Sequence, residues 1–321
     1  MVSKRKSHGL DSTSAPTKSN ATLDHAGSEK CGISRNDTLA LCKPIAIRLT
    51  FIVSVVGIAL WCSGRSEELI TFVKQQEVVI KRAQTVPCSK DYDLTLYKGC
   101  APKRCGRVVM DGLVTSKEAE HLVELVESAL SYGGSTGGAS ILDLHSGAMS
   151  KGNGFVNIYS YLKKKKLDQI FTDDDFLLYT QIKNRIRQAI ATEFGILQEN
   201  LYLTKPTFFS RMTNATAKTI HDEYWHVHVD KETYGSFFYT SLLYLTNHNI
   251  DYTGGRFIFN DADANRTVEP RTGRVSFFTS GSENPHFVEK VTSGTRYAVT
   301  VSFTCDKDQA IRDPTSEAFQ D

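Results

Sequence analysis

The sequence predicts an α+β fold in which two helices precede a closed β structure. Apolar residues recur at helical spacing in two segments, residues 115–130 and 172–195. From Leu201 to Cys305 the pattern changes to short runs of β-branched and aromatic residues, separated by turns that contain glycine. Helices followed by a long series of strands are typical of α+β domains, and closely spaced strands favour a sandwich or jelly-roll barrel.

The composition excludes several classes of protein. With 321 residues, of which 40% are hydrophobic and 23% charged, the chain can bury a large core. Its 38 basic and 36 acidic residues leave a formal net charge of +2, so we expect no binding to nucleic acid. Seven cysteines form no C-x-x-C pair, which argues against a structural zinc site.

The N-terminal part predicts a disordered tail followed by one membrane span. Residues 1–44 are rich in Ser, Thr, Lys and Asn. Ile45 to Gly64 is apolar except for Arg48, and about twenty helical residues cross a bilayer. The alternative is a buried core helix, but the segment shows no polar face. Basic residues precede the span and Glu67 and Glu68 follow it, so the prediction is a signal-anchor with its N-terminus in the cytosol.

This orientation predicts a single-pass type II membrane protein whose larger part lies in the lumen of the endoplasmic reticulum or Golgi. An even set of cysteines suits two disulfides in such an oxidising compartment, with the pairing left open: Cys88, Cys100, Cys105 and Cys305. Asn214 and Asn265 each begin an Asn-x-Thr sequence, so both are predicted glycosylation sites.

Residues 65–107 are predicted to form a luminal stalk and a cysteine-containing segment. Arg65 to Gln84 contains no glycine or proline, and five apolar residues could form one helical stripe, namely Leu69, Phe72, Val73, Val79 and Ile80. We expect a stalk helix here. A short coiled coil that joins two chains into a homodimer is the alternative, although the heptads are not sustained.

Residues 108–306 are predicted to form the main domain, followed by a C-terminal tail at 307–321. Its first helix is expected to begin at a capping box made by Thr115 and Glu118. The second is expected to begin after Thr172, where three aspartates complement the helix dipole, and to end at Gly195.

The segment from His226 to Asp230 (HVHVD) is the densest cluster of potential metal ligands. Alternate side chains of a strand share one face, so His226, His228 and Asp230 are expected to point the same way. His286 is the candidate for a third ligand from another strand. Two histidines and one carboxylate leave open positions on one side of an octahedral ion, which suits ferrous iron that binds a cosubstrate and oxygen.

Arg296 completes the predicted site. By alternation it shares a strand face with Ala298 and Thr300, whereas Tyr297 and Val299 face the other way. A cation among small residues inside a barrel is costly unless it meets an anion, and a guanidinium suits a carboxylate. These features call for a carboxylate-bearing ligand beside the metal.

The order His228-x-Asp230, His286 and, ten residues later, Arg296 resembles the prolyl and lysyl hydroxylase group of iron- and 2-oxoglutarate-dependent oxygenases. The stretch from Tyr252 to Phe259 resembles the Gly-Gly turn of that group and the strand after it. Gly294-Thr-Arg-Tyr297 resembles the lysyl hydroxylases in particular, where the basic residue is arginine. The resemblance covers roughly Val108 to Asp306.

The resemblance implies a double-stranded β-helix in which His228, Asp230 and His286 hold Fe(II) and Arg296 holds the distal carboxylate of 2-oxoglutarate. Tyr244 matches a position where related hydroxylases place a tyrosine against the same carboxylate. Such dioxygenases use O2 and 2-oxoglutarate to hydroxylate a substrate, release succinate and CO2, and commonly depend on ascorbate. The luminal placement suggests a peptidyl prolyl or lysyl residue of an unidentified protein.

The alternative function is a catalytically silent, membrane-anchored scaffold protein that binds metal, because fold alone does not establish activity. The intact set of four residues favours the enzyme. His226 is expected to lie in the pocket without binding the metal. The remaining conspicuous histidines are expected on the surface or in loops: His145, His221 and His248.

Overall fold

The computed structural model describes residues 48, 51–56, 69–167 and 170–315. The chain divides into two compact units, residues 1–65 and 66–321. In the first unit, residues 48 and 51–56 are helical; the predicted tail at 1–44 and most of the predicted span at 45–64 lie outside the described residues. Among the residues that are described, no helix combines the length and apolar character needed to cross a membrane.

The described residues of the second unit form two β-sheets. The larger sheet has the strand order β2 (Arg82–Val86), β3 (Cys105–Met110), β13 (Val275–Thr279), β9 (Tyr239–Tyr244), β15 (Val291–Thr304), β8 (Tyr202–Thr213), β5 (Ala139–Leu142), β6 (Ala148–Gly152) and β4 (Gly134–Ser135). Two further strands pair outside this path, β10 (Tyr252–Gly254) with β15 and β7 (Gly154–Asn157) with β6. The smaller sheet has the order β1 (Leu69–Val73), β12 (Asn265–Val268), β11 (Phe257–Asn260) and β14 (His286–Val288).

From β8 onward the chain passes repeatedly between the two sheets. After β8 in the larger sheet it meets the smaller one, where His228 pairs with His286, and then returns to β9. It crosses again to β11 and β12, back to β13, over to β14 and finally to β15. Neighbouring strands of this core, including β10 beside β15, run antiparallel. This alternation is the topology of a double-stranded β-helix, as the sequence resemblance implies.

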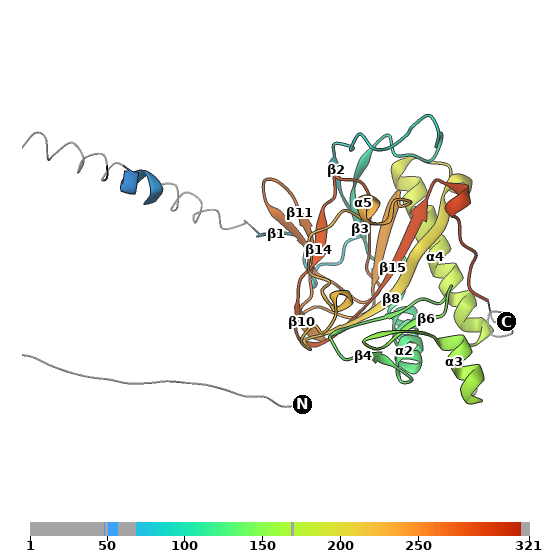
Figure 1. Ribbon diagram of the computed structural model, residues 1–321. Coiled ribbons are helices and arrows are strands. Elements are labelled where there is room, and N and C mark those ends of the chain that lie inside the picture. The colour runs from blue at the N-terminus through green and yellow to red at the C-terminus, as the bar shows by residue number, and fades with distance from the viewer. Residues whose placement is uncertain (1–47, 49–50, 57–68, 168–169, 316–321) are drawn as a thin grey trace, which may run out of the picture. The chain divides into compact units, whose positions relative to one another are not determined.

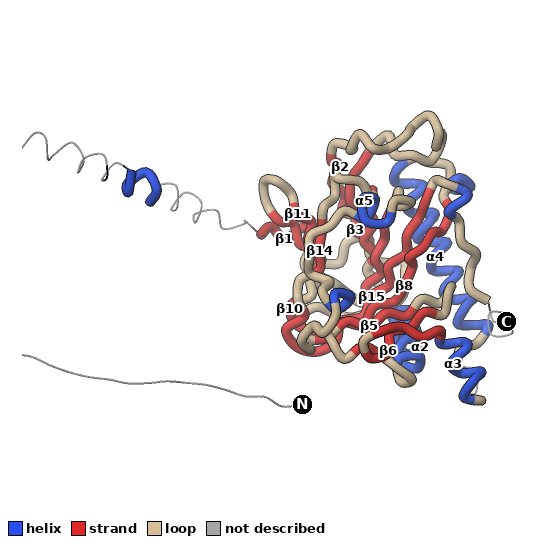
Figure 2. Tube along the Cα trace, in the orientation of Figure 1, coloured by secondary structure: helices blue, strands red, loops and turns tan. Residues whose placement is uncertain are grey.

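The helices cover the outer face of the larger sheet. Figure 1 and Figure 2 show α2 (Ser116–Leu130) and α4 (Asp173–Phe194) on the side of that sheet away from β11 and β14. A short helix, α3 (Ile158–Lys165), precedes α4. The predicted capping box of Thr115 and Glu118 is confirmed. So is the second helix start at Thr172, and Gly195 ends that helix in the left-handed conformation with φ 65°.

Two hydrophobic clusters separate the layers. One joins α2 and α4 to the outer face of the larger sheet, and the other fills the space between the two sheets. In β15, Tyr297 and Val299 belong to the first cluster and Ala298 to the second. The predicted alternation along this strand is therefore confirmed, and Arg296, two residues before Ala298, is 1% exposed.

The stalk helix predicted for Arg65 to Gln84 is wrong for its described part. Residues 69–73 form β1, which pairs in parallel with β12, and residues 82–86 form β2, which pairs with β3. Of the expected apolar stripe, Val79 is buried whereas Ile80 is 87% exposed. The β-branched residues of this segment complete sheets formed by distant strands. Its described residues, 69–84, therefore contain no helix for the alternative, a coiled-coil homodimer.

Two disulfides resolve the pairing that the sequence left open. Cys88 pairs with Cys105, at a sequence separation of 17, and Cys100 pairs with Cys305, at a separation of 205. The second bond joins the segment before the domain core to the end of β15. The described part of this segment, residues 69–107, is thus fastened to the domain.

Replacing both Cys100 and Cys305 by Ala is expected to lower the free energy of unfolding by about 2–5 kcal/mol, because the bond closes a long loop in the unfolded chain. The matched change is Cys88 and Cys105 to Ala, which opens a much shorter loop and is expected to cost less. Denaturant unfolding of both variants measures the difference. An equal or smaller loss for the Cys100–Cys305 pair would contradict the loop-length argument.

Candidate metal centre and active site

Three predicted ligands meet where the two sheets face each other. His286 begins β14, and its backbone exchanges two hydrogen bonds of 3.0 Å with that of His228. Asp230 is the first residue of a short helix, α5 (Asp230–Tyr234). The segment 226–230 is therefore a single β-bridge that runs into a helix, not the continuous strand that the alternation predicted. His228 and Asp230 nevertheless converge, as expected.

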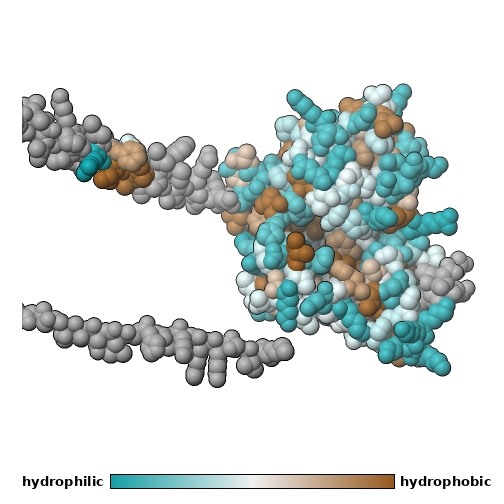
Figure 3. Space-filling view, in the orientation of Figure 1, coloured by the Kyte–Doolittle hydropathy of each residue, from teal (hydrophilic) through white to brown (hydrophobic). Residues whose placement is uncertain are grey.

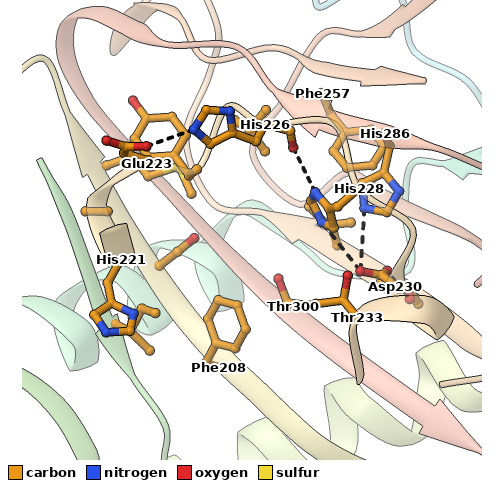
Figure 4. Close-up of a pocket in the computed structure, with 18 of the residues that line it drawn as sticks. Phe208, His221, Glu223, His226, His228, Asp230, Thr233, Phe257, His286 and Thr300 are labelled. Carbon is orange, nitrogen blue, oxygen red and sulfur yellow. Dashed lines mark hydrogen bonds and ion pairs between the residues drawn. The ribbon is translucent and has the colours of Figure 1, made fainter. Parts of the chain in front are cut away.

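The ligand atoms of the three side chains all lie within 4.8 Å of one another. Asp230 Oδ1 is 3.6 Å from Nε2 of His228 and 3.7 Å from Nε2 of His286 (Figure 4). The two imidazole ring centroids are 4.5 Å apart. Two nitrogens and a carboxylate oxygen at these separations can all bind one ion.

Hydrogen bonds on the far side of each imidazole set its tautomer. Nδ1 of His228 donates to the backbone oxygen of His226 at 3.0 Å, and Nδ1 of His286 donates to that of Asn284 at 2.9 Å. Because each Nδ1 is bonded to a backbone oxygen, each Nε2 is the ring nitrogen left to bind an ion. Both rings are thus oriented as metal ligands before any ion binds.

The carboxylate of Asp230 is buried, and a hydrogen bond fixes its second oxygen, Oδ2. Its Oδ2 accepts a hydrogen bond of 2.6 Å from the hydroxyl of Thr240, which lies 2.8 Å from the Ser280 hydroxyl. Burial alone would raise the pKa of Asp230, but electrostatic interaction with the neighbouring histidines and the hydrogen bond from Thr240 lower it below its usual value. Asp230 is therefore ionised at neutral pH and available to a cation.

The histidines differ in their surroundings. Burial lowers the pKa of His286, which keeps that imidazole neutral. Burial also acts to lower the pKa of His228. The contact of His228 with Asp230 outweighs this effect, so the pKa of His228 lies above its usual value. A metal ion would therefore compete with a proton more strongly at His228 than at His286.

Replacing Thr240 by Val is expected to weaken metal binding about 10- to 100-fold, because the shape is kept while the hydroxyl that orients Asp230 is lost. Titration of the full-length chain with Mn²⁺ measures the change. Ser241→Ala is the matched control, since its hydroxyl donates to Val301 in the same sheet and does not touch the ligands. Equal affinities for the Thr240 variant and the unaltered chain would exclude this role.

A cavity of about 430 Å³ opens beside the three ligands. Its walls come from both sheets, from α5 and from the segment 220–226; they include Phe208, Leu242 and Val288. Figure 3 shows hydrophobic residues around a hollow close to where Figure 1 draws β14. A concave, largely apolar space next to a cluster of metal ligands is the usual form of an active site.

Arg296 lines this cavity with one donor unused. Its Nε donates to the backbone oxygen of Gly255 at 2.9 Å, and Nη1 lies 3.6 Å from Sδ of Met212. Nη2 is buried and has no hydrogen-bond partner within the described part of the chain. An unpaired, buried guanidinium nitrogen is costly, so the site fits a ligand that brings a carboxylate.

Tyr244 lies beside Arg296 but does not line the cavity. Arg296 Cζ is 5.8 Å from the centroid of the Tyr244 ring, and the Tyr244 hydroxyl is 2.9 Å from that of Ser276. The geometry therefore gives no support to the contact with a cosubstrate carboxylate that the resemblance implied for Tyr244.

The other predicted histidines are placed as follows. His226 lines the cavity, as expected, and its Nε2 is 2.9 Å from a carboxylate oxygen of Glu223 (Figure 4). His221 is exposed at the cavity mouth, whereas His145 is half-buried and bonded to Tyr179. His248 lies in a turn, in line with the prediction of a surface or loop position, but it is 5% exposed and packs against Tyr252.

The two predicted glycosylation sites differ in their exposure to solvent. Asn214 is exposed, so it stays a predicted acceptor. Asn265 lies in β12 at 5% exposure, and its side-chain oxygen accepts a hydrogen bond of 2.7 Å from Asn260. A glycan requires an accessible amide nitrogen, so the structure does not favour Asn265 as an acceptor.

Sequence reasoning missed Thr240 and Tyr224. Thr240 positions Asp230, and Tyr224 lines the cavity while its hydroxyl accepts from the backbone of Val291 at 3.0 Å. Strand alternation in β9 places Thr240 and Leu242 on one face, which was the signal available for Thr240. Tyr224 lies in irregular structure, where no period predicts the direction of a side chain.

Comparison with known proteins agrees with this geometry. Residues 209–304 match the sequence profile of the 2OG-Fe(II) oxygenase superfamily, and this range contains all three ligands and Arg296. The chain is 55% identical over 264 residues to "2-oxoglutarate and iron-dependent oxygenase domain-containing protein 3" of Xenopus tropicalis, which covers 81% of this chain and 83% of that protein.

More distant similarities were also found. Prolyl 3-hydroxylase 1 of Mus musculus is 30% identical over 229 residues, covering 64% of this chain and 29% of that protein. Among solved structures, a prolyl hydroxylase of Trichoplax adhaerens in complex with a hypoxia inducible factor peptide aligns with a TM-score of 0.42 at 15% identity, over 63% of this chain and 85% of that one.

Proposed function

The chain belongs to the 2OG-Fe(II) oxygenase superfamily, and from this premise we propose that it is an active dioxygenase that hydroxylates a peptidyl residue. One observation carries the proposal: the three ligands and the unpaired guanidinium of Arg296 meet in one cavity. A protein that only stored a metal ion would not require a buried cation beside it.

The residues present fit the cosubstrates that the family implies. His228, Asp230 and His286 would hold Fe(II), and Arg296 would hold the distal carboxylate of 2-oxoglutarate. When bound, the ferrous centre supplies the oxidising chemistry that couples loss of CO2 from 2-oxoglutarate to hydroxylation of an unactivated carbon. Succinate is the expected coproduct.

The residues of the chain itself orient the metal ion and the cosubstrate and exclude water from the site. The Nδ1 hydrogen bonds fix the two imidazoles, and Thr240 fixes the carboxylate, so the ligands need no rearrangement on binding. Phe257 packs against His286, with ring centroids 5.1 Å apart, and keeps one side of the metal position apolar. The guanidinium of Arg296 fixes the direction in which a dicarboxylate enters.

The cavity favours a neutral substrate residue such as proline over lysine. Among its described lining residues the carboxylates are Asp230, which faces the metal position, and Glu223, which is bonded to His226. No further carboxylate there is placed to receive an ammonium group, and the remaining walls are largely apolar. The similarity to prolyl 3-hydroxylase 1 points the same way.

We further propose the setting in which this reaction occurs. The apolar segment 45–64 would anchor the chain as a type II membrane protein, with the catalytic unit in the lumen of the endoplasmic reticulum or Golgi. The two disulfides of this unit support an oxidising compartment. Ascorbate would maintain the iron, as it commonly does in such enzymes.

The full-length chain, purified in detergent with Fe(II), is expected to release CO2 from carboxyl-labelled 2-oxoglutarate and to add 16 Da to proline-rich peptides. Lysine-containing peptides without proline are expected to gain no mass. Asp230→Ala serves as the inactive control. If the chain binds metal and 2-oxoglutarate but releases no CO2 with any peptide or with luminal protein extracts, it is the metal-binding scaffold instead.

A further inference from the structure

Asp222 is a carboxylate buried between two walls of the cavity, and it is 1% exposed. Its Oδ2 accepts hydrogen bonds from the backbone N–H groups of Lys218 at 3.1 Å and Thr219 at 2.9 Å. Its Oδ1 accepts from the Ser135 hydroxyl at 2.7 Å and from the backbone of Ala139 at 3.4 Å. Burial acts to raise the pKa of Asp222, but the hydrogen bonds lower it to about 2, so the group is ionised at neutral pH.

The two oxygens of Asp222 bind different parts of the fold. The partners of Oδ2 belong to the turn that leads into a short 3-10 helix, η2 (Ile220–Asp222). The partners of Oδ1 lie in β4 and β5. Residues 139–141 of β5 line one wall of the cavity, and Ile220, His221, Glu223 and Tyr224 line another. The carboxylate therefore fixes the separation of these two walls.

The glycine-rich turn before β5 is shaped around this carboxylate. A Cβ atom on Gly137 would overlap the carboxylate of Asp222, so no side chain fits at this position. The backbone of Gly137 donates to the Ser135 hydroxyl at 2.9 Å, which holds that hydroxyl toward Asp222. Gly138, with φ 100°, accepts a hydrogen bond of 2.8 Å from the backbone of Thr213 at the end of β8. The turn thus receives the start and the end of the segment 213–222.

The wall that Asp222 holds carries side chains that are exposed at the cavity mouth. Ile220 is 80% exposed although it lines the cavity. The ring of His221 packs edge-on against Phe155 of β7, with centroids 5.5 Å apart. Figure 4 shows His221 at the end of the pocket away from the three predicted metal ligands. An apolar side chain in solvent at the entrance of an apolar cavity is well placed to contact a bound molecule.

The position of this wall relates it to the substrate and not to the cosubstrate. Arg296, which would hold 2-oxoglutarate, is 1% exposed and therefore lies in the interior of the cavity. Ile220 and His221 are both exposed. They meet the molecule that occupies the mouth while the cosubstrate fills the interior.

We propose that Asp222 is a positioning residue for substrate binding: by joining η2 to β5 it holds Ile220 and His221 where the peptide substrate contacts them. Asp222 itself touches neither the metal position nor the cosubstrate. The inference rests on the proposed function, because it takes a peptide as the substrate. A wall that is already ordered saves the free energy that ordering a loop would otherwise take from binding.

The test measures peptide binding apart from cosubstrate binding. Calorimetry with the full-length chain loaded with Mn²⁺ and 2-oxoglutarate, which does not turn over, gives the Kd of a decaproline peptide. Asp222→Ala is expected to weaken decaproline binding about 10-fold or more, because the wall must then be ordered on binding. The Kd of 2-oxoglutarate for the Mn²⁺-loaded variant should change less than about 2-fold.

Two further variants and a control separate positioning from a general loss of structure. Asp222→Asn keeps an acceptor for the two backbone N–H groups, so its decaproline affinity should return to within about 3-fold of that of the unaltered chain. Ser135→Ala removes only the tie to β4 and should give a smaller loss than Asp222→Ala. Ser146→Ala is the matched control, since its hydroxyl donates to Asp143 outside the cavity lining, and it should bind decaproline normally.

The outcomes distinguish this inference from the proposed function. If a folded Asp222→Ala variant binds decaproline as tightly as the unaltered chain, or loses affinity for 2-oxoglutarate to the same extent, the role of Asp222 is wrong and the proposed function stands. Thermal melting establishes whether each variant is folded, and if Asp222→Ala is not, Ser135→Ala decides by the same criteria. If the unaltered chain does not bind decaproline, the inference fails together with the peptide substrate, and CO2 release shows whether the oxygenase activity remains.

Discussion

Replacing Asp230 by Ala is expected to lower the metal affinity at least about 100-fold and to abolish the release of CO2 from 2-oxoglutarate. Asp230 is the carboxylate among the three ligands, and its charge offsets that of a divalent ion. The two histidines would remain with no anion between them. Equilibrium titration with Mn²⁺ and a decarboxylation assay measure the two losses.

Asp263→Ala is the matched control for this change. The Asp263 side chain is 69% exposed, pairs with Arg266 and lies outside the cavity lining. Its removal is expected to leave metal affinity and turnover unaltered. Should Asp230→Ala retain the metal ion as well as the control does, His228 and His286 would not be ligands of one site with it.

Replacing Arg296 by Met is expected to weaken the binding of 2-oxoglutarate about 100-fold or more, while the metal affinity changes little. Methionine keeps the apolar stem and leaves no charge buried in the cavity. The lost interaction is a charge-assisted contact inside a space that excludes water, where such contacts are strongest. Calorimetry with the Mn²⁺-loaded chain measures both affinities.

Arg256→Met is the control, because Arg256 follows the same Gly-Gly turn but pairs with Glu289 outside the cavity lining. It should bind 2-oxoglutarate as tightly as the unaltered chain. Unchanged binding in the Arg296 variant would mean that another group receives the distal carboxylate, and the cavity would need a different assignment.

The parts of this site that the sequence predicted depend on short-range patterns. Arg296 and its neighbours follow the period of a strand, and the helix starts at Thr115 and Thr172 are set by residues within one turn. The pair His228 and Asp230 was found by the same period, although Asp230 belongs to a helix. His228 and Asp230 therefore converge as predicted, but because a helix begins at Asp230 and not because the two residues share a strand.

The parts that could not be predicted depend on distant contacts. Leu69 of β1 pairs with Asn265, far along the chain, so no local pattern separates this strand from a helix. The partner of Cys100 is likewise set by the closure of the fold. The hydroxyl of Tyr244 lies 2.9 Å from that of Ser276, a contact that no motif encodes.

The most direct test of the account is a crystal structure of the full-length chain with Mn²⁺ and 2-oxoglutarate. It is expected to show the ion bound by Nε2 of His228, Nε2 of His286 and a carboxylate oxygen of Asp230, with the distal carboxylate of 2-oxoglutarate at Nη2 of Arg296. An ion bound elsewhere, or a cosubstrate that does not reach Arg296, would contradict the account.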